Sequence, residues 1–83
     1  MGKYAPLTAW LRKQPGKSVE LTFSKIEEEI IHDKLPPHAR QYLRGWDNTA
    51  GSSMNDSFIS AGWGTVMVDL ENEKVKFQRK MGI

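Results

Sequence analysis

Neither a disulfide nor a thiolate metal site can hold this chain together, because its 83 residues include no cysteine. Its two histidines are too few for a structural zinc site without cysteines. A chain of this length buries only about 60% of its unfolded surface, so its stability must come from one hydrophobic core. We therefore expect a single domain over residues 1–83, with frayed ends near residues 1–3 and 80–83.

The composition is that of a soluble globular domain, with 39% hydrophobic and 27% charged residues. No apolar stretch approaches the roughly 20 residues that span a bilayer, and the N-terminal segment lacks the apolar run of a signal peptide. We therefore expect a cytoplasmic protein with no membrane partner. The net charge of +2 is small, so any binding of anions needs a local cluster of cations.

The first part of the chain predicts a helix and a strand. Residues 6–14 carry apolar side chains at helical spacing, and a Pro-Gly pair then ends the helix. Arg12 and Lys13 place positive charge in its last turn, where the helix dipole favours it. Residues 18–23 alternate apolar and polar side chains, which is typical of a half-buried strand.

A second helix is predicted directly after this strand. Ser24 and Glu27 have the spacing of a capping box. The isoleucines that follow form its buried face, so the acidic run over residues 27–29 is expected to be solvated.

The segment LPPHARQYLRGWDN, residues 35–48, predicts an amphipathic helix. Its two prolines can open a helix but cannot lie inside one. Beyond them apolar residues recur at helical spacing and form one stripe, namely Ala39, Tyr42, Leu43 and Trp46. Arg40 and Arg44 then fall on the opposite, exposed face.

The C-terminal part predicts a short helix followed by a β-hairpin. Ser53 is expected to cap the helix, with Met54 and Phe58 facing inward and Gly62 ending it. Strands over residues 65–70 and 74–78 are joined by a short polar connection, as in a hairpin. The side chains expected on their apolar faces are Val66, Val68 and Leu70 in the first strand, and Val75 and Phe77 in the second.

This order of elements predicts an α+β fold. It contains three or four helices and a small antiparallel sheet that ends in a C-terminal β-hairpin. Apart from one additional helix, the order is that of a winged helix, in which a three-stranded sheet backs a trio of helices. Fold alone would not define a function.

Five short motifs are distributed along the chain, namely Tyr4-Pro6-Leu7, Thr22-Phe23-Ile26-Glu27, Leu35-Pro36-Ala39-Arg40, Trp46-Asn48 and Ala61-Gly62-Trp63. With them the sequence resembles an uncharacterised family of small bacterial domains with the pattern Y-x-P-L, T-F-x-x-I-E, L-P-x-x-A-R, W-x-N and A-G-W. The resemblance covers nearly the whole chain. It implies no settled activity, although a nucleic-acid role is suspected for the family. One departure is residues 31–34, where the family pattern implies a tighter, glycine-containing turn.

The residues that favour nucleic-acid binding are Arg40, Arg44, Asn48, Lys74 and Lys76. The two arginines lie one helical turn apart, and the two lysines share one strand face. Both pairs suit contacts with phosphates, and the side-chain amide of Asn48 can read a base. Arg79 and Lys80 follow the hairpin. The sequence thus predicts a non-enzymatic nucleic-acid-binding domain, with DNA favoured over RNA and without cofactor or metal. Scattered cations that only keep the surface soluble are an equally good interpretation.

The alternative is a protein-interaction or accessory domain without affinity for nucleic acid. Ile59 and Met67 fall off the apolar stripes and are the candidates for an exposed apolar patch. A metal-dependent nuclease would need His38, Asp47 and Asp56, whose spacing does not favour a metal site.

The aromatic and histidine side chains also have two interpretations. Tryptophan can stack on an exposed base, but it more often fills a core. We expect Trp10, Trp46 and Trp63 in the core, and His32 and His38 at the surface.

Overall fold

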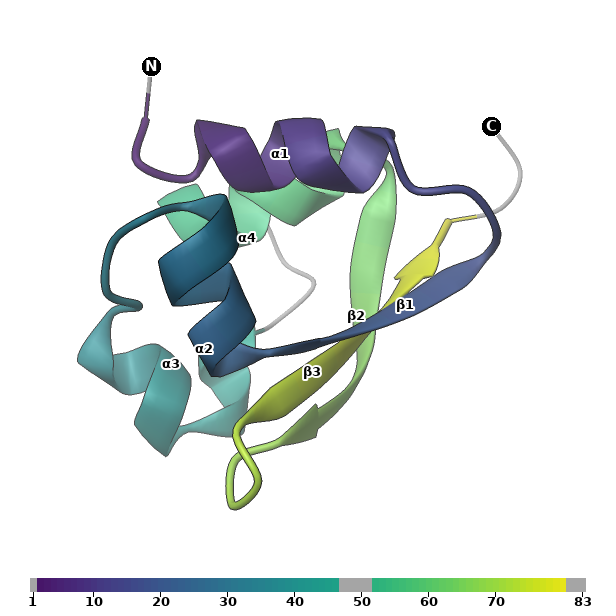
Figure 1. Ribbon diagram of the computed structural model, residues 1–83. Coiled ribbons are helices and arrows are strands. Elements are labelled where there is room, and N and C mark those ends of the chain that lie inside the picture. The colour runs from purple at the N-terminus through teal and green to yellow at the C-terminus, as the bar shows by residue number, and fades with distance from the viewer. Residues whose placement is uncertain (1, 47–51, 81–83) are drawn as a thin grey trace.

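The computed structural model describes residues 2–46 and 52–80. The elements in chain order are α1 (Ala5–Arg12), β1 (Ser18–Thr22), α2 (Phe23–Lys25), the π-helical η1 (Ile26–Ile30), α3 (Pro37–Gln41), the 3-10 helix η2 (Leu43–Trp46), α4 (Ser53–Ser60), β2 (Trp63–Asp69) and β3 (Lys74–Arg79). The helices lie on one side of the sheet (Figure 1), so the domain is α+β, as predicted. No helix of the described residues is long and apolar enough to cross a bilayer. The likeness to a winged helix stays a prediction.

The sheet is antiparallel with the strand order β1-β3-β2, so the last strand lies in its centre. Leu21, Val75 and Phe77 are buried against the helices. Glu20 and Lys76 are partners across the β1–β3 pair, and both are exposed on the opposite face. The predicted hairpin of β2 and β3, with its buried valine and phenylalanine, is confirmed.

The prediction that Val66 faces the core is wrong, because a β-bulge interrupts β2 between Thr65 and Met67. A bulge inserts one residue and reverses the alternation of side chains beyond it. Before the bulge, Thr65 is buried and its hydroxyl donates to the Trp46 carbonyl at 2.6 Å. After it, Val68 packs against the core. Val66 and Met67 are left 54% and 43% exposed.

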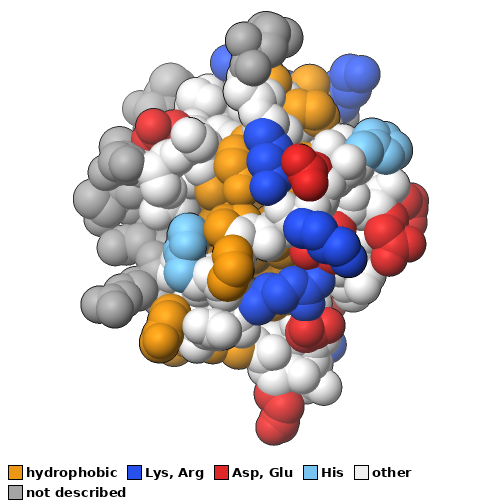
Figure 2. Space-filling model, turned by 90° about the vertical axis from the view of Figure 1, so that its left-hand side faces the viewer, with side chains coloured by type: hydrophobic (Ala, Val, Ile, Leu, Met, Phe, Trp, Pro, Cys, Tyr) orange, Lys and Arg blue, Asp and Glu red, His pale blue; other side chains and the backbone are white. Residues whose placement is uncertain are grey.

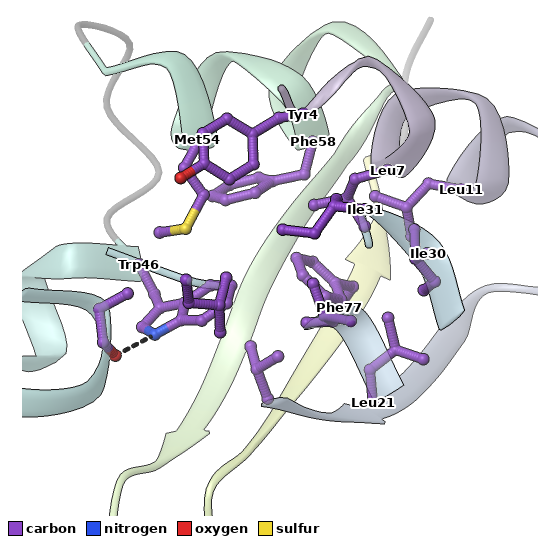
Figure 3. Close-up of a cluster of buried hydrophobic side chains, with 14 of the residues drawn as sticks. Tyr4, Leu7, Leu11, Leu21, Ile30, Ile31, Trp46, Met54, Phe58 and Phe77 are labelled. Carbon is purple, nitrogen blue, oxygen red and sulfur yellow. Dashed lines mark hydrogen bonds between the residues drawn. The ribbon is translucent and has the colours of Figure 1, made fainter. Parts of the chain in front are cut away.

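Aromatic rings form the centre of the core (Figure 3). Phe23 stacks on Trp46 with 5.3 Å between the ring centroids. Phe77 contacts Trp46 and Phe58 at 6.3 and 5.4 Å. Trp46 and Trp63 are 1% and 0% exposed, which confirms both as core residues. Because these rings come from helices and from strands, one core joins the two layers.

The helix predicted over residues 37–46 is interrupted. α3 ends before Tyr42, whose backbone is extended with φ −133° and ψ 138°, and η2 follows. Ala39 and Trp46 are buried as predicted, but Tyr42 and Leu43 are 51% and 62% exposed. The predicted apolar stripe is therefore wrong in its middle.

The interruption lets the chain fold back so that Trp46 reaches the core. The Ala39 carbonyl lies in the last turn of α3, where donors within the helix run out. It accepts a hydrogen bond of 2.7 Å from Trp46 Nε1 (Figure 3). Gly45 lies so close to the same turn that an added Cβ would be 2.8 Å from the His38 carbonyl oxygen. In a continuous helix Ala39 and Gly45 would be about 9 Å apart along the axis.

Two helix caps differ from those predicted. Thr22, rather than Ser24, caps α2, and its hydroxyl accepts from the backbone N–H three residues on at 3.0 Å. Ser52, rather than Ser53, caps α4 in the same way at 3.1 Å. Glu27 is consequently free of the capping role that the sequence predicted for it.

The turn after η1, where a glycine was expected from the resemblance, contains a residue in a left-handed conformation. His32 has φ 54°, in the left-handed region that glycine adopts without strain. The Asp33 N–H donates to the Glu27 carbonyl at 3.0 Å across this turn, as in a helix C-terminal cap. A glycine is therefore the natural residue here, and the exposed histidine takes its place.

Candidate nucleic-acid interface

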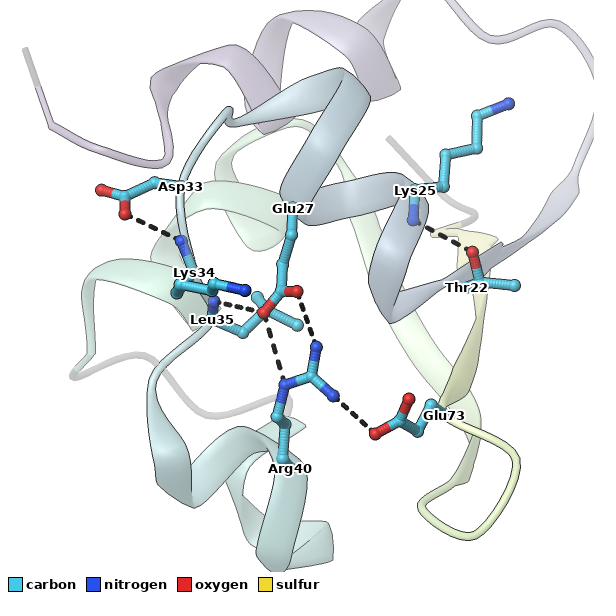
Figure 4. A network of polar contacts seen from close by, with 8 residues as sticks. All are labelled: Thr22, Lys25, Glu27, Asp33, Lys34, Leu35, Arg40 and Glu73. Atoms are coloured by element: carbon cyan, nitrogen blue, oxygen red, sulfur yellow. Dashed lines mark hydrogen bonds and ion pairs between the residues drawn. The ribbon is translucent and has the colours of Figure 1, made fainter.

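Arg40 is held between two carboxylates (Figure 4). Its Nη2 and Nε donate to the two oxygens of Glu27 at 2.6 and 3.3 Å, and its Nη1 donates to Glu73 at 2.5 Å. The guanidinium also lies 5.6 Å from the centre of the Phe23 ring. The prediction that Arg40 lies on a free outer face is wrong, because the fold itself neutralises its charge.

Of the acidic run over residues 27–29, Glu28 and Glu29 are exposed as predicted, but Glu27 is buried. Its Oε2 also accepts a hydrogen bond of 2.8 Å from the Leu35 N–H. Burial raises the pKa of Glu27, but the hydrogen bonds from Leu35 and Arg40 outweigh it and hold the pKa below its ordinary value. The hydrogen bond with Glu27 is also the first cause of a raised pKa for Arg40. Both groups are therefore charged at neutral pH.

Lys74 and Lys76 lie on the face of the sheet that the helices leave open. They share this face, as predicted, but each has a carboxylate beside it. Asp69 is the partner of Lys74 across the β2–β3 pair, and Glu20 is the partner of Lys76 across the β1–β3 pair. Opposite charges at such positions attract each other, so this surface has mixed charge.

The remaining predicted residues are Arg44 and Asn48. The backbone of Arg44 lies in η2, but its side chain and the whole of Asn48 lie outside the described residues. The side of the molecule with α3 also has mixed charge, since Figure 2 shows Lys and Arg side chains interleaved with Asp and Glu. Lys3 and Asp33, for example, form an ion pair of 3.8 Å. The nucleic-acid role of the five predicted residues stays a prediction.

A separate cluster of cations lies where the end of α1, the start of β1 and the end of β3 come together (Figure 1). We call it the basic end, and its members are Arg12, Lys13, Lys17, Arg79 and Lys80. Its segments, residues 12–17, 60–62 and 78–80, contain no acidic residue. Because five of the twelve Lys and Arg lie here, the rest of the chain has seven basic and ten acidic residues and a net charge of −3.

The two arginines of the basic end tie its segments together. Arg79 donates to the carbonyls of Gln14 and Gly16, and its guanidinium lies 4.6 Å from the centre of the Trp63 ring. Arg12 donates at 3.4 Å to a carbonyl at the end of α4. Arg12 is itself exposed, and so are the three lysines, Lys13, Lys17 and Lys80.

Sequence reasoning found these cations one by one but not as a cluster. The pairs Arg12-Lys13 and Arg79-Lys80 were visible at the ends of predicted elements. What joins them is the pairing of the first strand with the last, where the Arg79 N–H donates to the Lys17 carbonyl at 2.8 Å. A predicted pairing of these two strands would have revealed the cluster.

A family model with the description Domain of unknown function (DUF7662) matches residues 4–80. The chain belongs to this family. Comparisons with curated proteins and with solved structures found no match. The predicted membership of an uncharacterised family of small domains is thus confirmed, and the DUF7662 family brings no function with it.

In this DUF7662 domain, several of the sequence motifs meet in one place (Figure 4). Glu27, from T-F-x-x-I-E, binds both Leu35 and Arg40, from L-P-x-x-A-R. Phe23, from the first of these motifs, stacks on Trp46 of the W-x-N motif. These residues therefore take part in folding the domain.

Other sites offer little to a ligand. In residues 2–46 and 52–80, no three His, Cys, Asp or Glu side chains are placed to hold a metal ion, and Asp47 of the hypothetical nuclease site lies outside these ranges. A hollow of about 330 Å³ is lined by Glu27, Glu28, His32, Asp33 and Lys34. Small-molecule pockets are lined mostly by hydrophobic and aromatic residues, whereas all five residues here are charged or polar.

Proposed function

We propose that the DUF7662 domain binds nucleic acid through phosphate contacts at the basic end. The observation that carries the proposal is the gathering of five cations from described segments that contain no Asp or Glu, on a chain whose remaining charge is negative. Phosphate binding depends on clustered Lys and Arg, and an uneven charge also orients a protein toward a polyanion. The proposal keeps the predicted ligand class and moves the site away from α3.

The lysines and arginines contribute differently to this site. Lys13, Lys17 and Lys80 are exposed, so their ammonium groups are available to phosphates. Arg12 and Arg79 donate to carbonyls and fix the segments that carry the lysines. With about three phosphate contacts, binding to B-form DNA should weaken with salt with a logarithmic slope of roughly −3.

Fluorescence anisotropy with labelled DNA and RNA, at low and near-physiological salt, tests the proposal. The variant replaces Lys13, Lys17 and Lys80 by glutamine. We expect it to bind at least about tenfold more weakly at low salt and to lose most of the salt dependence, because each lost phosphate contact lowers the slope by about one.

A matched control replaces Lys34, Lys74 and Lys76 by glutamine, which changes the net charge by the same amount. We expect this control to keep nearly all of its affinity. Equal losses in the two variants would mean that binding follows overall charge, and a loss only in the control would place the site at Lys34 or on the open face of the sheet with Lys74 and Lys76. An unmodified domain that binds neither DNA nor RNA at low salt would refute the proposal.

A second candidate is a protein-interaction domain, which exposed apolar side chains favour. They are Tyr42, Leu43, Val66 and Met67. Of the two residues predicted for such a patch, Met67 is exposed, but Ile59 is half-buried and packs against the core. Salt-tolerant self-association that Met67→Ser abolishes would favour this candidate, whereas a monomer at high protein concentration would count against it.

A further inference from the structure

Trp10 differs from the other two tryptophans. Trp46 and Trp63 are almost completely buried, whereas Trp10 is half-buried and packs against the core with only part of its ring. Of the eight aromatic residues, only Trp10 and Tyr42 are not buried. Tyr42 follows α3 and does not belong to the segments of the basic end. Trp10 is therefore the aromatic side chain that can offer an exposed ring surface near the basic end.

Trp10 is connected to the basic end by helix geometry and by hydrogen bonds. It precedes Lys13, the C-cap residue of α1, by three residues, a spacing that places two side chains on the same helix face. The side-chain amide of Gln14 donates to the Trp10 backbone carbonyl at 3.1 Å, and the backbone carbonyl of Gln14 accepts a hydrogen bond from the Arg79 side chain. On the α2 side, Lys25 brings its Nζ to 5.8 Å from the centre of the Trp10 ring. Its side chain extends away from the ion pairs in Figure 4.

We propose that Trp10 receives an unstacked base, so that the ligand of the basic end is single-stranded nucleic acid. This inference rests on the proposed function. Lys25, whose Nζ lies over the Trp10 ring, is displaced from it by the stacked base, and Lys13 at the end of α1 then binds a flanking phosphate. The bases of a duplex stack on one another and do not offer their faces to a surface ring, whereas single-strand binding combines aromatic rings with a basic path. Stacking uses the π face of any base, so DNA and RNA are both ligands without strong sequence preference.

The test compares single-stranded DNA, single-stranded RNA and a duplex of the same sequence at constant salt. Single strands should bind at least about fivefold more tightly than the duplex, because stacking on one ring strengthens binding by that much or more. Trp10→Leu keeps an apolar side chain and should remove this preference. Trp10→Phe keeps a ring and should retain most of it. Equal affinities of single strand and duplex for the unmodified domain would overturn the inference.

Inorganic polyphosphate, which has phosphates and no bases, separates stacking from folding. We expect Trp10→Leu to bind polyphosphate as tightly as the unmodified domain does. A parallel loss of affinity for polyphosphate would show that Trp10 only supports the structure of the basic end, and would overturn the inference.

Tryptophan fluorescence of the unmodified domain provides a measurement that needs no variant. Saturating single-stranded oligonucleotide should quench part of the emission, because a base then lies on Trp10, whereas polyphosphate should not. Unchanged emission in the saturated complex would contradict stacking. Failure to bind any polyanion, polyphosphate included, would refute the proposed function itself.

Discussion

At the scale of single residues, Arg40 shows how a structural ion pair can be mistaken for a ligand contact. Its position in an amphipathic pattern predicts an exposed cation. Its actual partners are Glu27 of η1, which precedes it in the sequence, and Glu73 of the β2–β3 turn, which follows it. Glu27 in turn has a buried carboxylate that needs a counter-charge, because an unpaired buried charge is very unfavourable.

Replacing Arg40 should therefore destabilise the folded domain and not only weaken the binding of a ligand. We expect Arg40→Met to lower the free energy of unfolding by about 3 kcal/mol, because Glu27 is left without its partner. Chemical denaturation measures this change. Lys76→Met, which removes an exposed cation, should shift stability by no more than about 0.5 kcal/mol. An Arg40→Met domain as stable as this control would show that the ion pair is dispensable.

The same pair predicts how stability depends on pH. The pKa of Glu27 is lowered in the folded state, so the contribution of Glu27 to the free energy of unfolding is fully present at a pH above the ordinary pKa of 4.5. It is lost as the pH falls through the lower pKa of the folded state. Urea denaturation at pH 6 and at pH 3 should show a smaller loss of stability in Glu27→Gln than in the unmodified domain. Identical losses in the two proteins would contradict this assignment.

At the scale of elements, the α3–η2 segment shows where local periodicity stops being informative. Ala39 and Trp46 follow helical spacing and are buried, so the sequence identified these two core residues but not the exposed Tyr42 and Leu43. They reach it through a broken helix, because Trp46 donates back to Ala39 and stacks on Phe23. The close approach of Gly45 to α3 makes this fold-back possible.

Gly45→Ala tests the fold-back directly. The added methyl group would lie 2.8 Å from the His38 carbonyl oxygen and 2.9 Å from the Ala39 Cα, and both are backbone atoms that cannot rotate away. We expect a loss of roughly 1–3 kcal/mol, as for overpacking elsewhere. Gly2→Ala is the matched control, since nothing lies within 4 Å of its added Cβ. Thermal unfolding of both variants measures this loss. Equal melting temperatures of the two variants would argue against the close approach of Gly45 to α3.

The turn between η1 and α3 offers a stabilising substitution. His32 adopts φ 54°, which is unfavourable for a residue with a Cβ. His32→Gly should therefore raise stability by roughly 0.5–1 kcal/mol, net of the entropy that glycine adds to the unfolded chain. His32→Ala serves as the comparison, because it removes the imidazole but keeps the Cβ. If both variants lose stability equally, the imidazole rather than the backbone conformation is what matters at this position.

At the scale of the whole molecule, one core holds together elements from both ends of the chain. Leu7 of α1, Phe58 of α4 and Phe77 of β3 all belong to it (Figure 3). A domain with one core should unfold in a single cooperative step. Circular dichroism and tryptophan fluorescence should therefore give the same midpoint during urea denaturation. A hairpin that melts before the helices would separate the two curves.

The charge distribution is also a property of the whole molecule. The net charge of +2 is the difference between a basic end and a remainder with excess acid. Composition reports only the sum, so it could exclude strong nonspecific binding but could not locate a patch. The two arginines that tie the basic end do so through carbonyls of α4 and of the segment between α1 and β1, which are distant in the sequence.

The sequence by itself determined the α+β class, the C-terminal hairpin and most of the core, because periodicity and turn residues act over a few neighbouring positions. Tertiary structure alone decided three features. It paired Glu27 with Arg40, placed a bulge at Val66, and joined Lys17 to Arg79 at the basic end. Each of these depends on which distant segment lies beside which. Charge attraction and packing act between residues that are close in space, and the order of residues along the chain does not state which distant segments are close.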